Sequence, residues 1–395
     1  MNNSLLKNIR FIAVTEGVSM TPFILARDGL FIKPQSFKKL KVNDIVVFQR
    51  KNKLITHRII FKNDKNCITK GDNKLISDGL IDPKQIIGKV YQIKRNKKII
   101  NLETQYLLQS TLYFQEIIKI KNAFEKAGVD FVFLKGLPLH LYFEKTHPKR
   151  IYADCDVLVA KKDFPKTEII IKKFGYRKND GKNKQVENNY IKFINGFAVI
   201  FDIHLEAAFL MTQFSGLEAL YPQKLIDQLT VDLLNNKRPI KINGEKFFIL
   251  NSKFLILYLA LHLFHHNFRG AFRYQFLDKV IRSSHLKNKD WQCIDKKITE
   301  YRLGNFVYPV FILLKKYFKT SIPYFVRVGR DRPLHLNIFN DQPRLQAGIN
   351  RFKNIFSLSP SPWWKKIFIF ISPSVIYFIF WSLKKKLSSF FLKDR

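Results

Sequence analysis

Three aspartates have residue types and spacing that suit a divalent-metal site. Asp154 and Asp156 alternate in Asp154-Cys155-Asp156-Val157-Leu158-Val159, a run typical of a strand. Side chains two positions apart on a strand point to the same face, so these carboxylates lie close together. They repel each other unless a cation lies between them, and Mg²⁺ is the natural cation for oxygen ligands. A third carboxylate, Asp202 on a neighbouring strand, would complete a site for one or two metal ions.

Asp202 belongs to a predicted hairpin. Tyr190–Ile194 and Phe197–Leu205 flank Asn195-Gly196, a two-residue turn suited to type I′ geometry. Before this hairpin, a strand at Phe131–Leu134 and a helix after Leu137 precede the aspartate strand. Alternation of this kind favours an α/β or α+β core.

The residues around the aspartates resemble the polymerase-β-like nucleotidyltransferase superfamily, most closely its uncharacterised bacterial branch. The shared motifs are Leu134-Lys135-Gly136, Arg150 with Asp154-Cys155-Asp156-Val157-Leu158-Val159, and Asp202-Ile203-His204. The resemblance runs from about Asn101 to Ser284. It implies that the three aspartates hold Mg²⁺ on a nucleoside triphosphate. An acceptor then attacks the α-phosphorus and pyrophosphate leaves.

Lys135 and Gly136 stand where the superfamily usually has Gly-Ser. Gly136 would let the backbone approach a phosphate closely, while Lys135 and Arg150 would neutralise its charge. The alternative is a strand-end acidic pair with Arg150 as its ion-pair partner. A later helix, Lys253–Phe268, carries three histidines that we interpret as core or cleft-lining residues, because no Cys or Glu nearby completes a zinc site.

The first quarter of the chain has a different pattern, in which short alternating runs are separated by polar turns. A strand at Arg10–Thr15 leads into Gly17-Val18-Ser19-Met20-Thr21-Pro22, a tight segment that can hold one hydroxyl out of a sheet. Further strand-like runs lie at 42–48, 55–60, 68–73 and 87–90. The pattern predicts a small, coiled β-structure.

This series resembles the LexA and signal-peptidase clan of serine peptidases. The family's motifs occur in order: the Ser19 segment, a Gly-Asp-type turn at Asn43-Asp44 before a strand, His57-Arg58, and Thr69-Lys70-Gly71-Asp72-Asn73. The resemblance implies that Ser19 is the nucleophile and His57 its general base, since a serine hydroxyl is inert unless a base takes its proton.

Two acidic residues follow the predicted base. By the resemblance, either Asp72 or Asp78 would orient His57 and stabilise its cation. The alternative is purely structural: Ser19 caps a turn, His57 packs on a strand and Asp72 closes a turn. These peptidases usually have an N-terminal membrane helix, whereas Met1–Gly17 is too short and too charged to predict an anchor.

The formal net charge of +38 favours attraction to a polyanion, although a composition rich in Lys, Asn, Ile and Phe would also produce it. Near the C-terminus, Ile367–Leu383 is nearly all apolar, with Trp363 and Trp364 before it and Lys384 to Lys386 after it. It is shorter than the ~20 residues of a membrane span, so we expect a buried or surface-lying helix, with peripheral membrane contact through 363–386. Three separated cysteines predict a reducing compartment and no structural zinc.

Together these patterns predict two domains: an all-β peptidase-like domain over 1–98, and an α+β nucleotidyltransferase-like domain over 99–284, followed by a helical extension over 285–395. The main hypothesis is a cytoplasmic Mg²⁺-dependent enzyme that transfers a nucleotidyl group from a nucleoside triphosphate to an unknown acceptor. The alternatives are a serine peptidase that processes a leader peptide or itself, and a degenerate binding protein for a polyanion or a membrane surface. Nucleic acid is a partner that the sequence allows but does not favour.

Overall fold

Short apolar runs in the first hundred residues form an antiparallel sheet of eight strands. The computed structural model describes residues 11–74, 76–145, 154–179, 187–207, 219–323, 337–342 and 344–367. The sheet order is β1-β2-β7-β3-β4-β5-β6, with β8 pairing β7. The strands are β1 Phe11–Val14, β2 Gly29–Lys33, β3 Ile45–Arg50, β4 Lys53–Lys62, β5 Cys67–Lys70, β6 Leu80–Ile81, β7 Ile86–Arg95 and β8 Lys98–Asn101.

Strand β3 explains why this sheet has two small cores. Ile45 and Val47 belong to one buried cluster, whereas Val46 and Phe48 belong to another. Alternate residues of a strand point to opposite faces, so a continuous apolar run marks a strand that is covered on both sides. The predicted β-rich N-terminal region is therefore confirmed. Short 3₁₀ helices at Phe37–Lys39 and Pro83–Gln85 lie in its loops.

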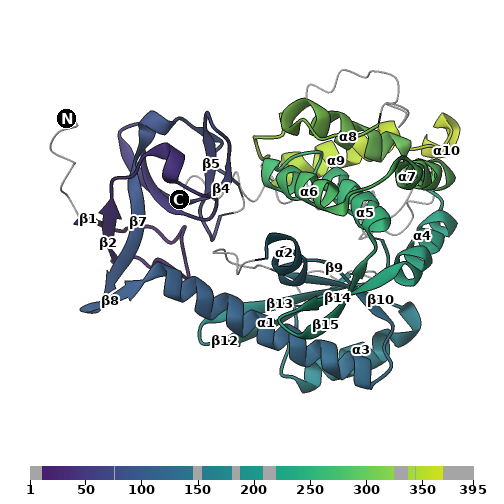
Figure 1. Cartoon of the computed structure of the whole chain (residues 1–395), viewed down its shortest axis with the longest axis horizontal. Helices are drawn as coiled ribbons and strands as arrows, with labels where there is room; N and C mark the ends of the chain where they lie inside the picture. Colours follow the sequence, from purple (N-terminus) through teal and green to yellow (C-terminus); the bar gives the residue numbers. More distant parts are fainter. Residues whose placement is uncertain are drawn as a thin grey trace.

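Helix α1, Leu102–Lys126, leads from this sheet to the second region (Figure 1). Its first residue follows β8 directly, and the Asn101 side chain caps it by accepting a hydrogen bond from the Glu103 amide at 2.9 Å. Leu102 and Tyr106 pack in a core of the N-terminal sheet, whereas Tyr113 and later residues pack in the larger core. The helix therefore contributes to both regions.

The second region is built on a mixed sheet of seven strands in the order β11-β12-β13-β10-β9-β15-β14. The strands are β9 Phe131–Lys135, β10 Cys155–Val159, β11 Arg177–Lys178, β12 Glu187–Ile194, β13 Phe197–His204, β14 Lys237–Ile242 and β15 Glu245–Leu250. The predicted hairpin is β12–β13, and Asn195 and Gly196 both have positive φ, as a type I′ turn requires. Strand β10 runs parallel to β13 and antiparallel to β9.

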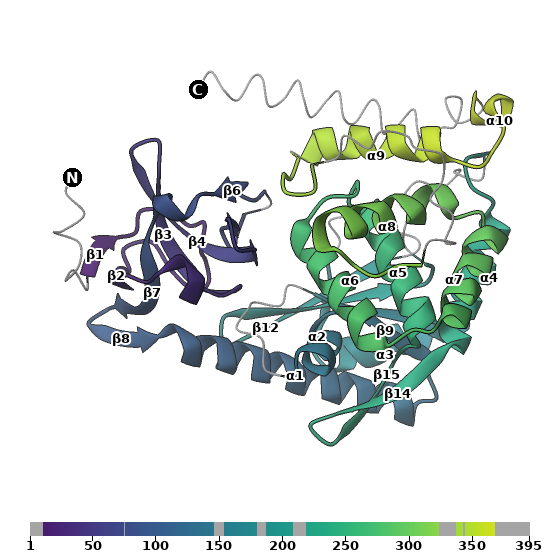
Figure 2. The same ribbon diagram turned by 45° about the horizontal axis from the view of Figure 1, so that its top comes forward.

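Helices complete the α+β region, as expected. Those between the strands are α2 Leu137–Glu144, a 3₁₀ turn at Lys161–Asp163, α3 Phe164–Lys173 and α4 Gln223–Asn235. A helical layer follows, and Figure 2 shows it stacked over the sheet. It consists of α5 Ser252–His265, α6 Ala271–Ser284, α7 Asn288–Glu300, α8 Gly304–Phe318, α9 Arg344–Leu358 and α10 Trp363–Ile367. Helix α5 is apolar around most of its circumference because α6, α7 and α8 all contact it.

The N-terminal sheet also contacts the helical layer. Phe61 on β4 packs against Phe318 and Phe339, with ring centroids 6.1 and 5.6 Å apart. Phe61 and Ile68 are members of the same buried cluster as the helices. These contacts fix the position of strands β4 and β5 relative to α6 and α8.

Within the described residues, no helix is both long enough and apolar enough to cross a bilayer. The apolar run after Ile367 lies outside the described residues. Just before it, the side chains of Trp363 and Trp364 are exposed. Cys67, Cys155 and Cys293 are free thiols.

Candidate functional site

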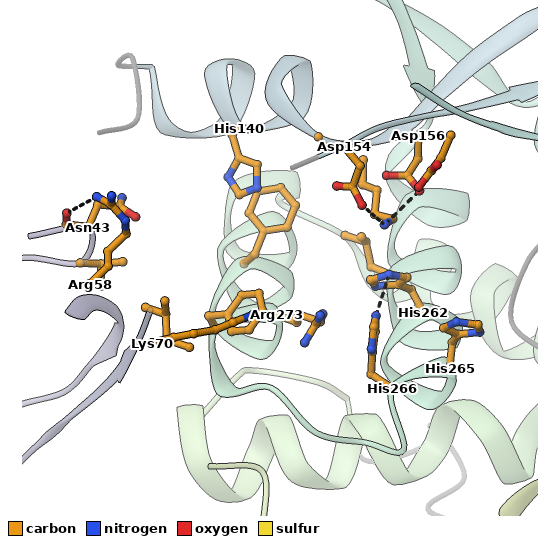
Figure 3. A pocket seen from close by; sticks show the side chains of 18 of the residues that line it. Asn43, Arg58, Lys70, His140, Asp154, Asp156, His262, His265, His266 and Arg273 are labelled. Atoms are coloured by element: carbon orange, nitrogen blue, oxygen red, sulfur yellow. Dashed lines mark hydrogen bonds and ion pairs between the residues drawn. The ribbon is translucent and has the colours of Figure 1, made fainter. Parts of the chain in front are cut away.

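A cavity of about 490 Å³ lies between the two regions (Figure 3). Its walls come from the N-terminal sheet on one side and from β9, β10, β13, α5 and α6 on the other. The predicted metal site and most of the other polar residues considered below line this one cavity. They include Arg58, Lys70, Gly71, Asp72, Lys135, Gly136, Asp154, Asp156, Asp202, His204, Tyr258, His262, His265, His266 and Arg273.

The three aspartates lie together. Parallel pairing of β10 and β13 sets Asp156 opposite Asp202, while Asp154 directly precedes β10 on the same side as Asp156. One carboxylate oxygen from each lies within 4.8 Å of the others. Asp156 is only 1% exposed, and its Oδ2 has no hydrogen-bond partner in the described part of the chain. Three carboxylates that include a buried, unsatisfied oxygen fit a hard divalent cation such as Mg²⁺.

Two neighbouring groups hold Asp156 in its charged form. Lys135 Nζ lies 3.0 Å from Asp156 Oδ1 and 3.9 Å from Asp154 Oδ2, and His204 Nε2 lies 2.9 Å from Asp156 Oδ1. Burial alone would raise the pKa of Asp156, but Lys135 and His204 outweigh it and keep that pKa below its ordinary value. Burial alone would lower the pKa of Lys135, but the negative charges of Asp154 and Asp156 outweigh it and raise that pKa above its ordinary value. Asp156 and Lys135 therefore stay charged at neutral pH.

Gly136 lies against the strand that carries the aspartates. Its φ is +104°, and a Cβ there would lie 3.1 Å from the Asp154 carbonyl oxygen and 3.2 Å from Cys155 Cα. Both the backbone conformation and the close approach require glycine. Its predicted partner in phosphate binding, Arg150, lies outside the described residues.

Three histidines line the cavity beside the aspartates: His262 and His265 on α5, and His266 directly after that helix. The Nε2 atoms of His262 and His266 lie 3.3 Å apart. Burial, followed by the positive charges of Lys135 and Arg273, lowers the pKa of His262 well below its ordinary value. Burial lowers the pKa of His266 in the same direction. Both rings are therefore neutral at pH 7, and the cluster of potential metal ligands found among the described residues consists of the aspartates alone.

In the N-terminal region, His57 on β4 joins Ser19 and Asp78, which lie in loops, in a separate hydrogen-bonded chain. Ser19 Oγ lies 3.0 Å from His57 Nε2, and His57 Nδ1 lies 2.6 Å from Asp78 Oδ2. Thr69 Oγ1 donates to the same Asp78 oxygen at 2.8 Å. This order of hydroxyl, imidazole and carboxylate is the arrangement that activates a serine.

Of the two acidic residues considered for His57, Asp78 is the one in contact. Asp72 instead accepts hydrogen bonds from Arg58 Nε at 2.7 Å and Nη2 at 2.5 Å. Arg58 lies over the ring of Tyr106, 4.5 Å from its centroid, so Asp72 and Arg58 connect the sheet to α1. The catalytic roles of these residues remain predictions.

Several lining residues carried no assignment from the sequence. Gly71 packs so tightly that a Cβ would lie 2.6 Å from the Ser19 carbonyl oxygen and 2.9 Å from His57 Nε2. Its place in the Thr69–Asn73 motif was the signal that could have identified it. His204 was visible in the Asp202-Ile203-His204 motif. Arg273, by contrast, belongs to no motif.

Comparisons with known proteins address the second region. A family model described as an uncharacterised nucleotidyltransferase matches residues 97–319. Among solved structures, the antibiotic-resistance factor ANT(2'')-Ia is similar at 12% identity and a TM-score of 0.32, covering 55% of this chain and 100% of that one. An antigenic nucleotidyltransferase-like protein from Paracoccidioides brasiliensis is similar at 12% identity and a TM-score of 0.33, covering 56% and 93%. No curated protein matches. Because the family model spans more than half of the sequence, this chain belongs to the uncharacterised nucleotidyltransferase family.

Proposed function

We propose that the chain is a Mg²⁺-dependent nucleotidyltransferase that moves a nucleotidyl group from a nucleoside triphosphate to an acceptor. The observation that carries this proposal is the group of three carboxylates, Asp154, Asp156 and Asp202, with oxygens within 4.8 Å of one another at a cavity of about 490 Å³. Membership of the nucleotidyltransferase family supports the same reaction. Transfer joins an acceptor oxygen to the α-phosphorus as the bond to the leaving pyrophosphate breaks.

In this proposal the three aspartates hold Mg²⁺, which neutralises and orients the triphosphate. His204 positions Asp156 through its hydrogen bond, and Lys135 offsets the negative charge of Asp154 and Asp156. Gly136 keeps the start of α2 close to the aspartate strand. His262 and His266, which are neutral, line the wall of the cavity with groups that donate or accept hydrogen bonds without adding charge.

The test is nucleotidyl transfer by the purified full chain. The wild type is incubated with each α-³²P-labelled nucleoside triphosphate, Mg²⁺ and a cell extract, and both labelled products and pyrophosphate are measured. We expect Asp156→Asn to reduce transfer by at least about 100-fold, because a metal ligand is lost. Asp227→Asn, an exposed aspartate on α4, serves as the control. The proposal fails if Asp156→Asn and wild type give equal labelling.

We propose, as a second function, that the N-terminal sheet hydrolyses a peptide bond through Ser19. The supporting observation is the chain from Ser19 to His57 to Asp78, with distances of 3.0 and 2.6 Å. A fluorophosphonate probe should modify the wild type once, as a single mass increment, and should leave Ser19→Ala unmodified. Equal modification of both proteins would refute this function.

Both activities are proposed to act in the cytoplasm, since the transferase needs nucleoside triphosphates. Fractionation of cells that produce the tagged full chain checks this proposal. Recovery of the chain outside the cytoplasmic and peripheral membrane fractions would contradict it.

A further inference from the structure

Lys70 extends from the N-terminal sheet into the transferase cavity. It is the last residue of β5 and lines the cavity together with the three aspartates (Figure 3). Its side chain is half-buried, and within the described residues it makes no hydrogen bond or ion pair. A lysine that is partly removed from water without a paired carboxylate is unusual and costs stability unless an anion binds to it.

Arg273 approaches the same part of the cavity from α6. Figure 3 shows the Lys70 side chain extending toward the helix that carries Arg273. Burial, followed by the charge of Arg273, lowers the pKa of Lys70, and Asp341 and Asp72 only partly offset this effect. Two cations from different regions of the chain therefore line the same cavity.

The two walls that carry these cations are fixed in place. Phe61 on β4 and Ile68 on β5 belong to the core of the helical layer, and β4 directly contacts α6. The amide of Ser77 also donates to Asp341 Oδ2 at 3.0 Å. This packing places Lys70 and Arg273 in the lining of one cavity.

We propose that Lys70 and Arg273 together bind a phosphate group of the substrate, so that the N-terminal sheet supplies part of the transferase site. The cavity then has carboxylates for a metal at one side and two cations at the other, which matches a metal-bound phosphate chain. This inference rests on the proposed function for the identity of the site. The phosphate group belongs either to the nucleotide's β,γ-tail or to a phosphorylated acceptor, and both sources have the same chemistry.

Calorimetric titration of the full chain tests the inference. The probes are inorganic tripolyphosphate and each nucleoside triphosphate with Mg²⁺, followed by inorganic phosphate added to the nucleotide-saturated protein. We expect Lys70→Gln to weaken binding by about 10- to 100-fold, the usual range for one charge-assisted hydrogen bond. Lys70→Arg should largely retain binding. Lys94→Gln, an exposed lysine on β7 of the same sheet, controls for the general positive charge of the protein.

The arms of this experiment identify the source of the phosphate. Weaker binding of tripolyphosphate and nucleotide by Lys70→Gln assigns the pair to the nucleotide tail. If Lys70→Gln binds nucleotide as tightly as the wild type but no longer binds the added inorganic phosphate, Lys70 and Arg273 bind a phosphate of the acceptor. If Lys70→Gln binds every probe as tightly as wild type, or if Lys94→Gln weakens binding equally, the inference is overturned.

Failure of the proposed function gives a different result. In that case the wild type binds no nucleoside triphosphate and Asp156→Asn changes nothing, while tripolyphosphate still binds in a Lys70-dependent way. That result would support the phosphate site and refute the proposed transferase function. Thermal unfolding of each variant confirms that the protein is folded under the conditions of titration.

Discussion

At the scale of single residues, His262 on α5 and His266 directly after it make stability depend on pH. The pKa values of His262 and His266 lie well below 6.5 in the folded chain, because burial disfavours their cations. The unfolded chain binds protons near pH 6.5 and the folded chain does not. Their contribution to stability is therefore complete above pH 6.5 and is lost as the pH falls below it.

We predict that the free energy of unfolding falls by up to about 1.4 kcal/mol per histidine for each pH unit below 6.5. Urea unfolding at pH 7.5, 6.5 and 5.5 measures this slope. In His262→Gln the slope should be smaller, whatever the absolute stability of the variant. A slope identical to that of the wild type would contradict the prediction.

A second residue-scale prediction concerns Gly71, which packs against Ser19 and His57. We expect Gly71→Ala to destabilise the fold by about 1–3 kcal/mol and to slow modification of Ser19 by a fluorophosphonate, because the new Cβ displaces one member of the pair. Gly17→Ala is the matched control, since the nearest atom to its Cβ would be 4.0 Å away. Equal effects of the two substitutions would show that the contact at Gly71 is unimportant.

At the scale of elements, the start of α2 depends on Gly136. Gly136→Ala adds both an unfavourable positive φ and a contact with the Asp154–Cys155 backbone. Gly196→Ala shares the positive φ but meets nothing within 4 Å. The positive φ should lower the free energy of unfolding of each variant by about 1–2 kcal/mol. In Gly136→Ala the contact should lower it by a further ~1–3 kcal/mol. Urea unfolding of both variants gives the difference, and equal losses would contradict the prediction.

The short helix α10 gives a prediction about membranes. Trp363 and Trp364 are 74% and 50% exposed, and Lys365 and Lys366 follow them. Aromatic and basic side chains together favour an anionic membrane interface. We expect the full chain to sediment with vesicles that contain phosphatidylserine, and a double Trp363→Ala, Trp364→Ala variant to sediment several-fold less. Equal sedimentation of variant and wild type would exclude this contact.

The sequence predicted those parts of the site that depend on local periodicity. The alternation of Asp154 and Asp156 places them on one face, and the hairpin turn at Asn195-Gly196 sets the strand that carries Asp202. It left the choice between Asp72 and Asp78 open, because both follow His57 in the sequence. The loop after β5 decides between them: it folds back so that the Asp78 amide donates to the Thr69 carbonyl oxygen at 2.8 Å and the Asp78 carboxylate reaches the ring.

Convergence between distant segments was not predictable in this way. Lys70 and Arg273 are separated by about half of the chain, and no spacing rule relates them. Their approach depends on the packing of Phe61 and Ile68 against the helices, which is a tertiary effect. For the same reason the sequence did not predict that Asp72 and Asp154, from different regions of the chain, line one cavity.

At the scale of the whole molecule, Phe61 joins the N-terminal sheet to the helical layer. Phe61→Ala should cost about 3–5 kcal/mol, because a large buried ring is removed, and should weaken nucleotide binding by moving the Lys70 wall. Leu54→Ala, on the same strand but 52% exposed, is the control and should change stability by less than about 1 kcal/mol. Urea unfolding and calorimetry measure the two effects, and a Phe61→Ala protein with wild-type nucleotide affinity would contradict the second.

Helix α1 has a consequence for the ancestry of the chain. Recombination exchanges domains most easily where a flexible linker joins them. Here β8 passes directly into α1, and Leu102 and Tyr106 are already part of the N-terminal core. A transferase fragment that started at Asn101 would carry an unburied leucine and tyrosine on its first two turns. Exchange of the N-terminal sheet for another domain would therefore require substitutions in those two turns. We expect the two parts of the chain to be inherited together.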